Sequence, residues 1–318
     1  MTVGIIGHYR CGEHDMGEHH PENGKRLTAI SDQLIRSGLD YVVRQFDANP
    51  IDKSLISLAH TQDYINFVFN NAPTEDDENF SVGEDSLMNS KTLTSILLSA
   101  GAAIDGVDLV MDKTLTSAFC ATRPPGHHAE HNKGMGFCFF NNVAIAAAYA
   151  RGKYQLKRVA IVDFDVHHGN GTEDIVKNHF PQVDNTSDGA YLFCSSYQYP
   201  FYPFDIQESN TPPIINTPLA ATTKSKDFRK AITEHWLPAL HKFKPEMIFI
   251  SAGFDAHIED DMSQVSLTDA DYRWVTDELK AIAQKHAQGR IISVLEGGYN
   301  LNALGRSVVA HINGLIGN

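Results

Sequence analysis

One polar stretch follows the largely β-branched run Val159–Val162 and reads Asp163-Phe164-Asp165-Val166-His167-His168-Gly169-Asn170-Gly171. A short apolar run before a glycine-rich polar segment predicts a buried parallel strand that meets its loop. Because side chains two apart on a strand point the same way, Asp163, Asp165 and His167 are expected to share a face. They are either metal ligands or an ordinary polar strand end, and the rest of the chain must decide between the two.

Three further polar clusters each follow a predicted strand. They read RPPGHHA at 123–129, SAGFD at 251–255 and EGGY at 296–299. The carboxyl ends of parallel strands meet on one rim of a sheet, where α/β proteins assemble their sites. Any one cluster could be a turn, but four at four strand ends indicate a functional site.

Strands and helices alternate along the chain, which predicts a parallel sheet covered on both faces. We therefore expect one α/β domain over residues 1–318, with a central, mostly parallel sheet of about eight strands and helices on both faces. The expected strands are Val3–Ile6, Thr116–Ala121, Arg158–Val162, Tyr191–Ser195, Met247–Ser251 and Ile291–Leu295. One helix is expected to start at Asn23. The other expected helices span Thr61–Phe69, Leu93–Met111, Asn142–Ala150, Lys226–Phe243, Thr268–His286 and Leu301–Ile316. Thr268 and Asp271 resemble a capping box at the start of their helix. A proline- and aromatic-rich loop is expected over Tyr197–Pro213.

The composition narrows the class of protein. A formal charge of −13 argues against a nucleic-acid partner and fits cationic ligands better. The four cysteines form no C-x-x-C pair, so neither a disulfide framework nor a zinc knuckle is expected. The N-terminus lacks the apolar run of a signal peptide, and we expect no segment of the roughly 18 to 20 apolar residues that span a bilayer. We expect a cytoplasmic protein without a membrane partner.

The chemistry of the clusters suggests a metal-dependent hydrolase. Asp165, His167 and Asp255 would supply three ligands and leave positions open for water and substrate. Such a metal lowers the pKa of water towards ~7 and polarises a carbonyl, which suits amide hydrolysis. Two carboxylates and one imidazole form a fairly hard site that accepts Fe(II) or Co(II) as well as zinc.

The remaining side chains fit the other roles of this reaction. His127 and His128 can supply the general base and acid. Asp163 and Asn170 are the expected partners that orient them. Tyr299, on a Gly-Gly turn, can donate its hydroxyl to the tetrahedral oxyanion.

The motifs together resemble the zinc-dependent histone deacetylase superfamily, in the right order and over almost the whole chain. The motif sequences are most similar to those of class II deacetylases and bacterial histone-deacetylase-like amidohydrolases, with acetylpolyamine amidohydrolases as near relatives. The matching motifs are HPENGKRL at 20–27, RPPGHHA at 123–129, GFCFFNN at 136–142, VDFDVHHGNGT at 162–172, SAGFDA at 251–256 and LEGGYN at 295–300.

The resemblance implies the arginase/deacetylase fold and hydrolysis of an N-acyl amine to a free amine and a carboxylate. It assigns the same zinc ligands, tandem histidines and tyrosine that the residues suggest. It also implies a structural potassium ion held by Asp163, Ser195 and Ser196 with the backbone of Asp165 and His167. Finally, it implies an acyl-lysine tunnel whose wall includes Gly136, Phe137, Tyr202 and Met262.

The substrate is the least secure inference from the resemblance. We expect acyl-lysine in proteins or peptides, because Met262 is not the acidic gatekeeper that polyamine-selective relatives place at the mouth. An acetylated polyamine remains an alternative substrate, because acidic side chains that could attract its positive charge stand at Asp76, Asp77, Glu78 and Glu84. The segment after Pro203 lacks the usual glycine-rich stretch before Asn216-Thr217-Pro218-Leu219, which indicates a reshaped rim.

Two other classes of function compete with this interpretation. An idle module that only binds acylated ligands should have lost a metal ligand, a tandem histidine or the tyrosine, and this chain keeps all of them. A serine or cysteine hydrolase would need a nucleophile motif such as Gly-x-Ser-x-Gly, which is absent. The sequence leaves homo-oligomerisation open.

Overall fold

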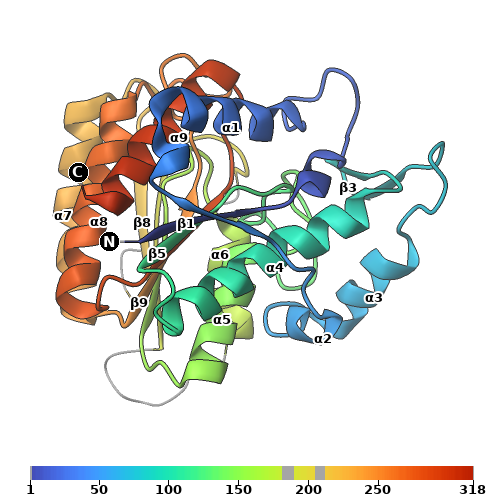
Figure 1. Cartoon of the computed structure of the whole chain (residues 1–318), viewed down its shortest axis with the longest axis horizontal. Helices are drawn as coiled ribbons and strands as arrows, with labels where there is room; N and C mark the ends of the chain where they lie inside the picture. The colour runs from blue at the N-terminus through green and yellow to red at the C-terminus, as the bar shows by residue number, and fades with distance from the viewer. Residues whose placement is uncertain (1, 181–189, 205–211, 318) are drawn as a thin grey trace.

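A single eight-stranded sheet forms the centre of the molecule (Figure 1). The structure, a computed structural model, describes residues 2–180, 190–204 and 212–317. All pairings in the sheet are parallel, and the strand order is β2-β1-β5-β10-β9-β6-β7-β8. The strands are β1 (Val3–Gly7), β2 (Arg44–Asp47), β5 (Ser117–Cys120), β6 (Val159–Asp163), β7 (Tyr191–Gln198), β8 (Ile214–Leu219), β9 (Met247–Ala252) and β10 (Ile291–Leu295).

Helices cover both faces of this sheet (Figure 1). One face carries α1 (Lys25–Ser37), α7 (Ser225–Phe243), α8 (Asp269–His286) and α9 (Leu301–Ile316). The other carries α2 (Lys53–Ile56), α3 (Gln62–Asn70), α4 (Thr92–Met111), α5 (Asn142–Tyr154) and α6 (Asn170–Asp174). A small antiparallel hairpin, β3 (Phe80–Gly83) and β4 (Ser86–Met88), stands apart from the main sheet. These layers confirm the predicted fold class.

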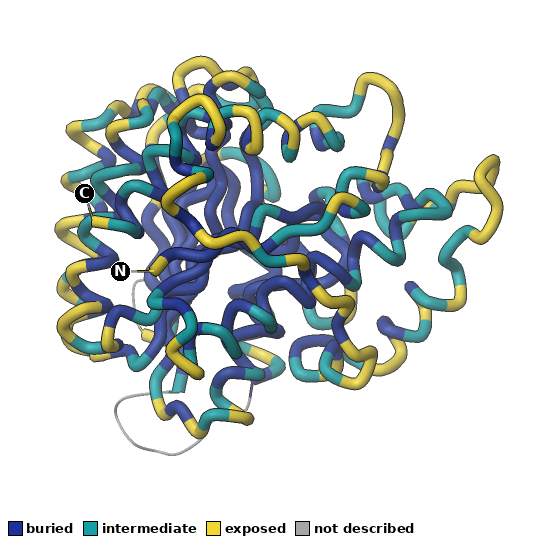
Figure 2. The backbone as a smooth tube through the Cα atoms, viewed as in Figure 1, coloured by how far each residue is buried: buried dark blue, intermediate teal, exposed yellow. Residues whose placement is uncertain are grey.

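Two hydrophobic cores lie on the two faces of the sheet, and every strand except β2 contributes side chains to both. In β6, Val159 and Ile161 belong to one core, while Ala160 and Val162 belong to the other. Burial on both faces explains why the central strands read as unbroken apolar runs. Figure 2 shows the buried strands at the centre and exposed residues along the outer helices and loops.

The sequence missed the two edge strands, β2 and β8. The side chains of β2 are mostly exposed, so it shows no apolar pattern. Strand β8 contains Pro218, which is tolerated at a sheet edge but argues against a strand when read from sequence. The predicted loop over Tyr197–Pro213 is wrong at its start, because β7 extends to Gln198; part of that loop, 205–211, lies outside the described residues.

Helix α4 corrects the expectation that no segment is long and apolar enough to cross a membrane. Among the described residues it is the one helix that passes that test by length and composition, and two-thirds of its apolar window is buried (67%). It packs against α5 and the sheet. A helix surrounded by protein and a helix in a membrane are both apolar on all sides, because neither has a face in contact with water.

The topology brings the four predicted clusters together. The clusters follow β5, β10, β9 and β6, which are the four adjacent strands in the middle of the sheet. Helix α8 begins with the predicted capping box of Thr268 and Asp271.

Candidate active site

The three predicted metal ligands lie together and are buried. Their ligand atoms all lie within 4.8 Å of one another, and within the described part of the chain no other group of three such side chains does so. The Nδ1 atom of His167 lies 3.1 Å from a carboxylate oxygen of Asp165 and 3.1 Å from one of Asp255. Two carboxylates and an imidazole in this arrangement fit a divalent metal ion.

Backbone groups fix the orientation of the two carboxylates. Val166 N–H donates to Asp255 (3.0 Å), and Gly297 N–H donates to Asp165 (2.8 Å). The second contact requires a close approach of backbone to carboxylate, and a Cβ atom at Gly297 would collide with both aspartates. The Gly-Gly pair of the last cluster is therefore needed for space beside the ligands.

The tandem histidines lie beside these ligands with their rings 4.0 Å apart between centroids. His128 Nδ1 lies 2.7 Å from Asn170 Oδ1, and the amide nitrogen of Asn170 donates to Glu130 (3.0 Å). Asn170 Oδ1 is thus the acceptor, so His128 carries its proton on Nδ1 and has a free lone pair on Nε2. His127 Nδ1 lies 2.9 Å from Asp163.

These partners push the two imidazoles towards opposite charge states. Burial, with the neighbouring His127 and His167, lowers the pKa of His128 well below its usual value. Burial would also lower the pKa of His127, but the carboxylates of Asp163 and Asp165 raise it to about 10. The pKa values of the two neighbouring imidazoles are therefore shifted in opposite directions.

Glu296 belongs to the predicted cluster at 296–299, but the sequence suggested no role for it. In the structure it binds the backbone of the segment that carries the tandem histidines. Its side chain is fully buried, and one oxygen accepts from the N–H groups of Gly126 (2.7 Å) and His127 (3.1 Å). Burial raises the pKa of Glu296 to about 7.

Tyr299 is held by contacts on its backbone and on its ring. Its N–H donates to Asp260 (2.6 Å), and the neighbouring N–H of Asn300 donates to the same carboxylate (2.8 Å). The ring lies over the guanidinium of Arg26 at 5.0 Å and meets the ring of Phe137 edge-on. Burial raises the pKa of Tyr299 well above its usual value, so its hydroxyl remains a proton donor.

A cavity of about 250 Å³ contains parts of this site and all four predicted tunnel residues, Gly136, Phe137, Tyr202 and Met262. Gly136 and Phe137 both have positive φ, and a Cβ atom at Gly136 would collide with the ring of His128. The cavity is also lined by Phe201, which stacks on His167 with ring centroids 5.4 Å apart. The sequence reasoning missed Phe201.

Asp85 is a second lining residue that the sequence reasoning missed. Its carboxylate accepts from Gly136 N–H (2.9 Å) and from the hydroxyl of Tyr202 (3.2 Å). It therefore joins the two sides of the tunnel. The adjacent acidic residues behave differently: Asp76 pairs with Lys91 (2.8 Å), and Asp76, Asp77, Glu78 and Glu84 do not line the cavity.

Ser195 and Ser196, the two serines proposed as potassium ligands, are consecutive residues of β7. Ser195 is the register partner of Asp163, and its buried hydroxyl has no hydrogen-bond partner among the described residues. Ser251 flanks Asp163 from β9, and its buried hydroxyl is likewise without a partner there. Orphaned oxygens beside a buried carboxylate fit a cation. Ser196 points to the opposite face, because side chains alternate along a strand.

A buried ion cluster lies behind the site and joins two of the motifs. Glu22 and Arg26 come from the 20–27 motif and Arg123 from the 123–129 motif; all three are 0% exposed. Arg123 pairs with Glu22, and Arg26 Nη1 lies 3.0 Å from the same carboxylate. Arg26 also donates to the carbonyls of Gly298 (2.7 Å) and Glu296 (2.5 Å). The cluster therefore fixes the loop that carries Tyr299.

The chain is similar to known deacetylases. The histone deacetylase domain matches residues 20–315. A probable deacetylase of Archaeoglobus fulgidus is 34% identical, over 95% of this chain and 82% of its own length. Histone deacetylase 10, chloroplastic, of Oryza sativa subsp. japonica is 34% identical, over 94% of this chain and 70% of its own.

Solved structures give the same result. The crystal structure of an HDA15 HD domain superposes with a TM-score of 0.89 and 29% identity, over 100% of this chain and 90% of that one. The matched domain spans almost the whole described sheet and every residue of the site. The chain belongs to the histone deacetylase family, whose members are amide hydrolases.

Proposed function

We propose that this protein removes an acetyl or other short acyl group from the side chain of acyl-lysine in proteins or peptides. The observation that carries the proposal is the narrow cavity that joins His128, His167 and Tyr299 between the rings of Phe137 and Tyr202. Its volume of about 250 Å³ suits a slender alkyl chain with an acyl end. Aromatic rings on both sides fit the apolar methylenes of a lysine side chain.

The metal centre would consist of Asp165, His167 and Asp255, with zinc as the expected ion and Fe(II) or Co(II) as alternatives. A divalent ion there acts as a Lewis acid and lowers the pKa of a water molecule towards ~7. Potassium would lie near Asp163 and Ser195, where the unpaired hydroxyl supports it.

The side chains around the cavity would carry the proton transfers. His128 Nε2, with its free lone pair, accepts a proton as water adds to the amide carbonyl. The hydroxyl of Tyr299 donates to the oxyanion. When the C–N bond breaks, the protonated His128 returns the proton to the amine nitrogen. Cationic His127, held by Asp163, contributes positive charge beside the developing negative charge.

An acetylated polyamine is the second candidate substrate, and Asp85 is the observation that favours it. A carboxylate in the tunnel wall can attract a cationic ligand. The same carboxylate can instead accept backbone N–H groups of a peptide, and Met262 on the wall adds apolar surface. We favour the peptide because Met262 lines the cavity and places apolar surface there in place of an acidic side chain.

Hydrolysis of an acetyl-lysine peptide and of acetylputrescine by the purified protein tests the proposal, each with and without a chelator. We expect chelator-sensitive turnover of both amides, with the larger kcat/KM for the peptide. A strong preference for acetylputrescine would replace the substrate assignment. Turnover that persists after complete metal removal would refute the metal-dependent reaction itself.

A further inference from the structure

The outer edge of β2 pairs with no strand among the residues that the structure describes. Strand β2 is the last in the sheet and pairs only with β1. Arg44, Gln45 and Asp47 are exposed, and Phe46 is half-buried. An uncovered edge presents unpaired backbone groups to which another extended chain can add.

The register shows which residues carry those groups. Ala48 N–H donates to Gly7 of β1 (2.8 Å), so the even-numbered residues direct their backbone towards β1. In a parallel strand, alternate residues turn to opposite sides. Gln45 and Asp47 therefore direct their N–H and C=O groups away from the sheet.

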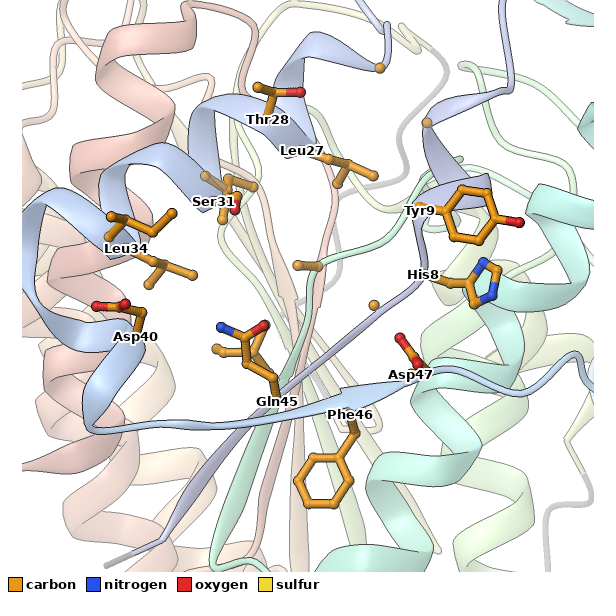
Figure 3. Close-up of a pocket in the computed structure, with 17 residues that line it drawn as sticks. His8, Tyr9, Leu27, Thr28, Ser31, Leu34, Asp40, Gln45, Phe46 and Asp47 are labelled. Atoms are coloured by element: carbon orange, nitrogen blue, oxygen red, sulfur yellow. The ribbon is translucent and has the colours of Figure 1, made fainter.

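A large cavity, about 810 Å³, lies on the α1 side of this edge (Figure 3). Its apolar lining includes Ile5, Leu27, Ile30 and Leu34. Gln45 points towards α1 in this view, whereas Phe46 points to the opposite face. Asp40 also lines the cavity, and one of its carboxylate oxygens is buried without a hydrogen-bond partner.

A second cavity, about 200 Å³, lies on the α4 side of the same strand and shares Phe46 and Asp47 with the first. Its charged lining is entirely acidic: Asp47, Asp105, Asp108 and Asp112. Nearby cations offset part of this charge, since Lys153 pairs with Asp108 (3.0 Å) and Arg44 lies over the ring of Phe46. Asp47 and Asp112 have no ion pair among the described residues.

Exposed apolar side chains gather beside the larger cavity. Tyr9, Ile35, Tyr41 and Val42 are 78%, 59%, 90% and 55% exposed, and they are half of the eight large apolar side chains exposed in the described chain. Tyr9 and Ile35 line the cavity itself, while Tyr41 ends the short 3-10 helix η2 (Leu39–Tyr41) between α1 and β2, and Val42 follows it. A concentration of this kind marks an interaction surface.

We propose that the β2 edge binds an extended, basic segment of a partner protein as an added strand. Backbone bonds to Gln45 and Asp47 would supply affinity, and side chains that alternate between the two faces would supply specificity. Apolar side chains of the segment enter the α1-side cavity. Lysine or arginine side chains lie over the acidic α4-side cavity. This surface is separate from the catalytic tunnel and does not rest on the proposed function.

Charge favours a basic partner over a second copy of this chain. Two copies paired through β2 would bring the aspartates of the α4-side cavity close to their own counterparts. The chain as a whole carries a formal charge of −13, which adds to that repulsion. A basic segment neutralises the same carboxylates.

Fluorescence anisotropy of labelled nine-residue peptides with the full chain at about physiological salt tests the proposal. The first peptide alternates lysine and valine, the second replaces lysine with glutamate, and the third has proline at the central valine. We expect micromolar binding of the first peptide only. Comparable binding of the glutamate peptide or of the proline peptide would overturn the proposal, as would no binding of the first.

Variants locate the binding surface. Gln45→Pro removes one outward N–H at a position where an edge strand tolerates proline, and it should abolish binding. Asp47→Asn with Asp112→Asn should weaken binding roughly tenfold, since an exposed ion pair is worth up to about fivefold. Glu234→Gln, an exposed neutralisation on α7, is the matched control. Circular dichroism and thermal unfolding verify that each variant is folded.

Two further outcomes would assign the binding elsewhere. Loss of binding in Asp85→Asn, with no effect of the β2 variants, would place the peptide at the tunnel mouth. Concentration-dependent dimers in sedimentation that Gln45→Pro abolishes would make a second copy the occupant of the edge. Either result overturns the assignment to a basic partner.

Discussion

Tyr299 reaches the tunnel because its surroundings hold both its backbone and its ring. Asp260 accepts its N–H, and Arg26 and Phe137 contact the ring. Tyr299→Phe removes the hydroxyl and leaves these contacts in place. We expect unchanged metal content and thermal stability with a loss of about 10²-fold or more in kcat, as for deletion of an oxyanion donor. Steady-state kinetics with metal analysis checks this, and near-normal turnover would contradict the oxyanion role.

Glu296 should act through the position of His127 and not through its own charge. Glu296→Ala leaves the N–H groups of Gly126 and His127 without their acceptor, whereas Glu296→Gln retains an oxygen in the same place. We expect kcat to fall about tenfold or more in the alanine variant and to stay within about threefold in the glutamine variant, because a lost buried acceptor costs ~1–3 kcal/mol. Equal loss in both variants would show that the charge itself matters.

The residues that the sequence reasoning found are those that stand in dense motifs at strand ends. Asp165 and Asp255 are recognisable because each follows an apolar run and is surrounded by glycine or histidine. Asp85 follows Glu84 and Asp260 lies in the run Glu259-Asp260-Asp261, so neither stands out among the 39 acidic residues in the chain. Only the fold shows that they hold Gly136 and Tyr299.

At the scale of elements, the Glu22–Arg26–Arg123 cluster joins the start of α1 to the loops after β5 and β10. Arg26→Met would leave two backbone carbonyls without donors and remove one of the partners of Glu22. We expect a loss of about 3–5 kcal/mol in the free energy of unfolding, as when one partner of a buried ion pair is removed. Urea denaturation measures it.

The matched control for that variant lies on the same helix. Arg36 is exposed in the last turn of α1, so Arg36→Met should change stability by no more than about 0.5 kcal/mol. A similarly small effect of Arg26→Met would mean that the loop carrying Tyr299 does not depend on the cluster.

The strands were predictable in the middle of the sheet and not at its edges. Interior strands such as β6 are buried on both faces, and this leaves a continuous apolar run in the sequence. Strand β2 reads Arg-Gln-Phe-Asp, because at the open edge its side chains remain largely in contact with solvent. Because no strand covers its outer side, β2 stays exposed, and for the same reason its sequence carries no apolar pattern from which a strand could be predicted.

At the scale of the whole molecule, burial of neutral histidines away from the metal ligands makes stability depend on pH. Burial lowers the pKa of His14 to about 4 and those of His60 and His311 to about 3. His60 accepts from Asn141 N–H (2.8 Å), and the ring of His311 lies between the hydroxyls of Thr276 (2.6 Å) and Ser293 (2.8 Å). Burial disfavours the charged form of all three imidazoles, so each is neutral in the folded chain at neutral pH.

The sign of the pH effect follows from the direction of these shifts. Below pH 6.5 the unfolded chain binds protons at all three histidines while the folded chain does not, so stability is present above pH 6.5 and is lost towards pH 3–4. Their combined slope approaches about 4 kcal/mol per pH unit near pH 5. Urea denaturation at pH 7.5, 6.5, 5.5 and 4.5 measures it. His311→Gln should reduce the slope of the free energy of unfolding against pH by about 1.4 kcal/mol per pH unit. His235→Gln, at an exposed position of α7, is the matched control and should leave this slope unchanged. An unchanged slope in His311→Gln would show that this histidine does not contribute, because removing a group that differs in protonation between the two states must alter the linkage.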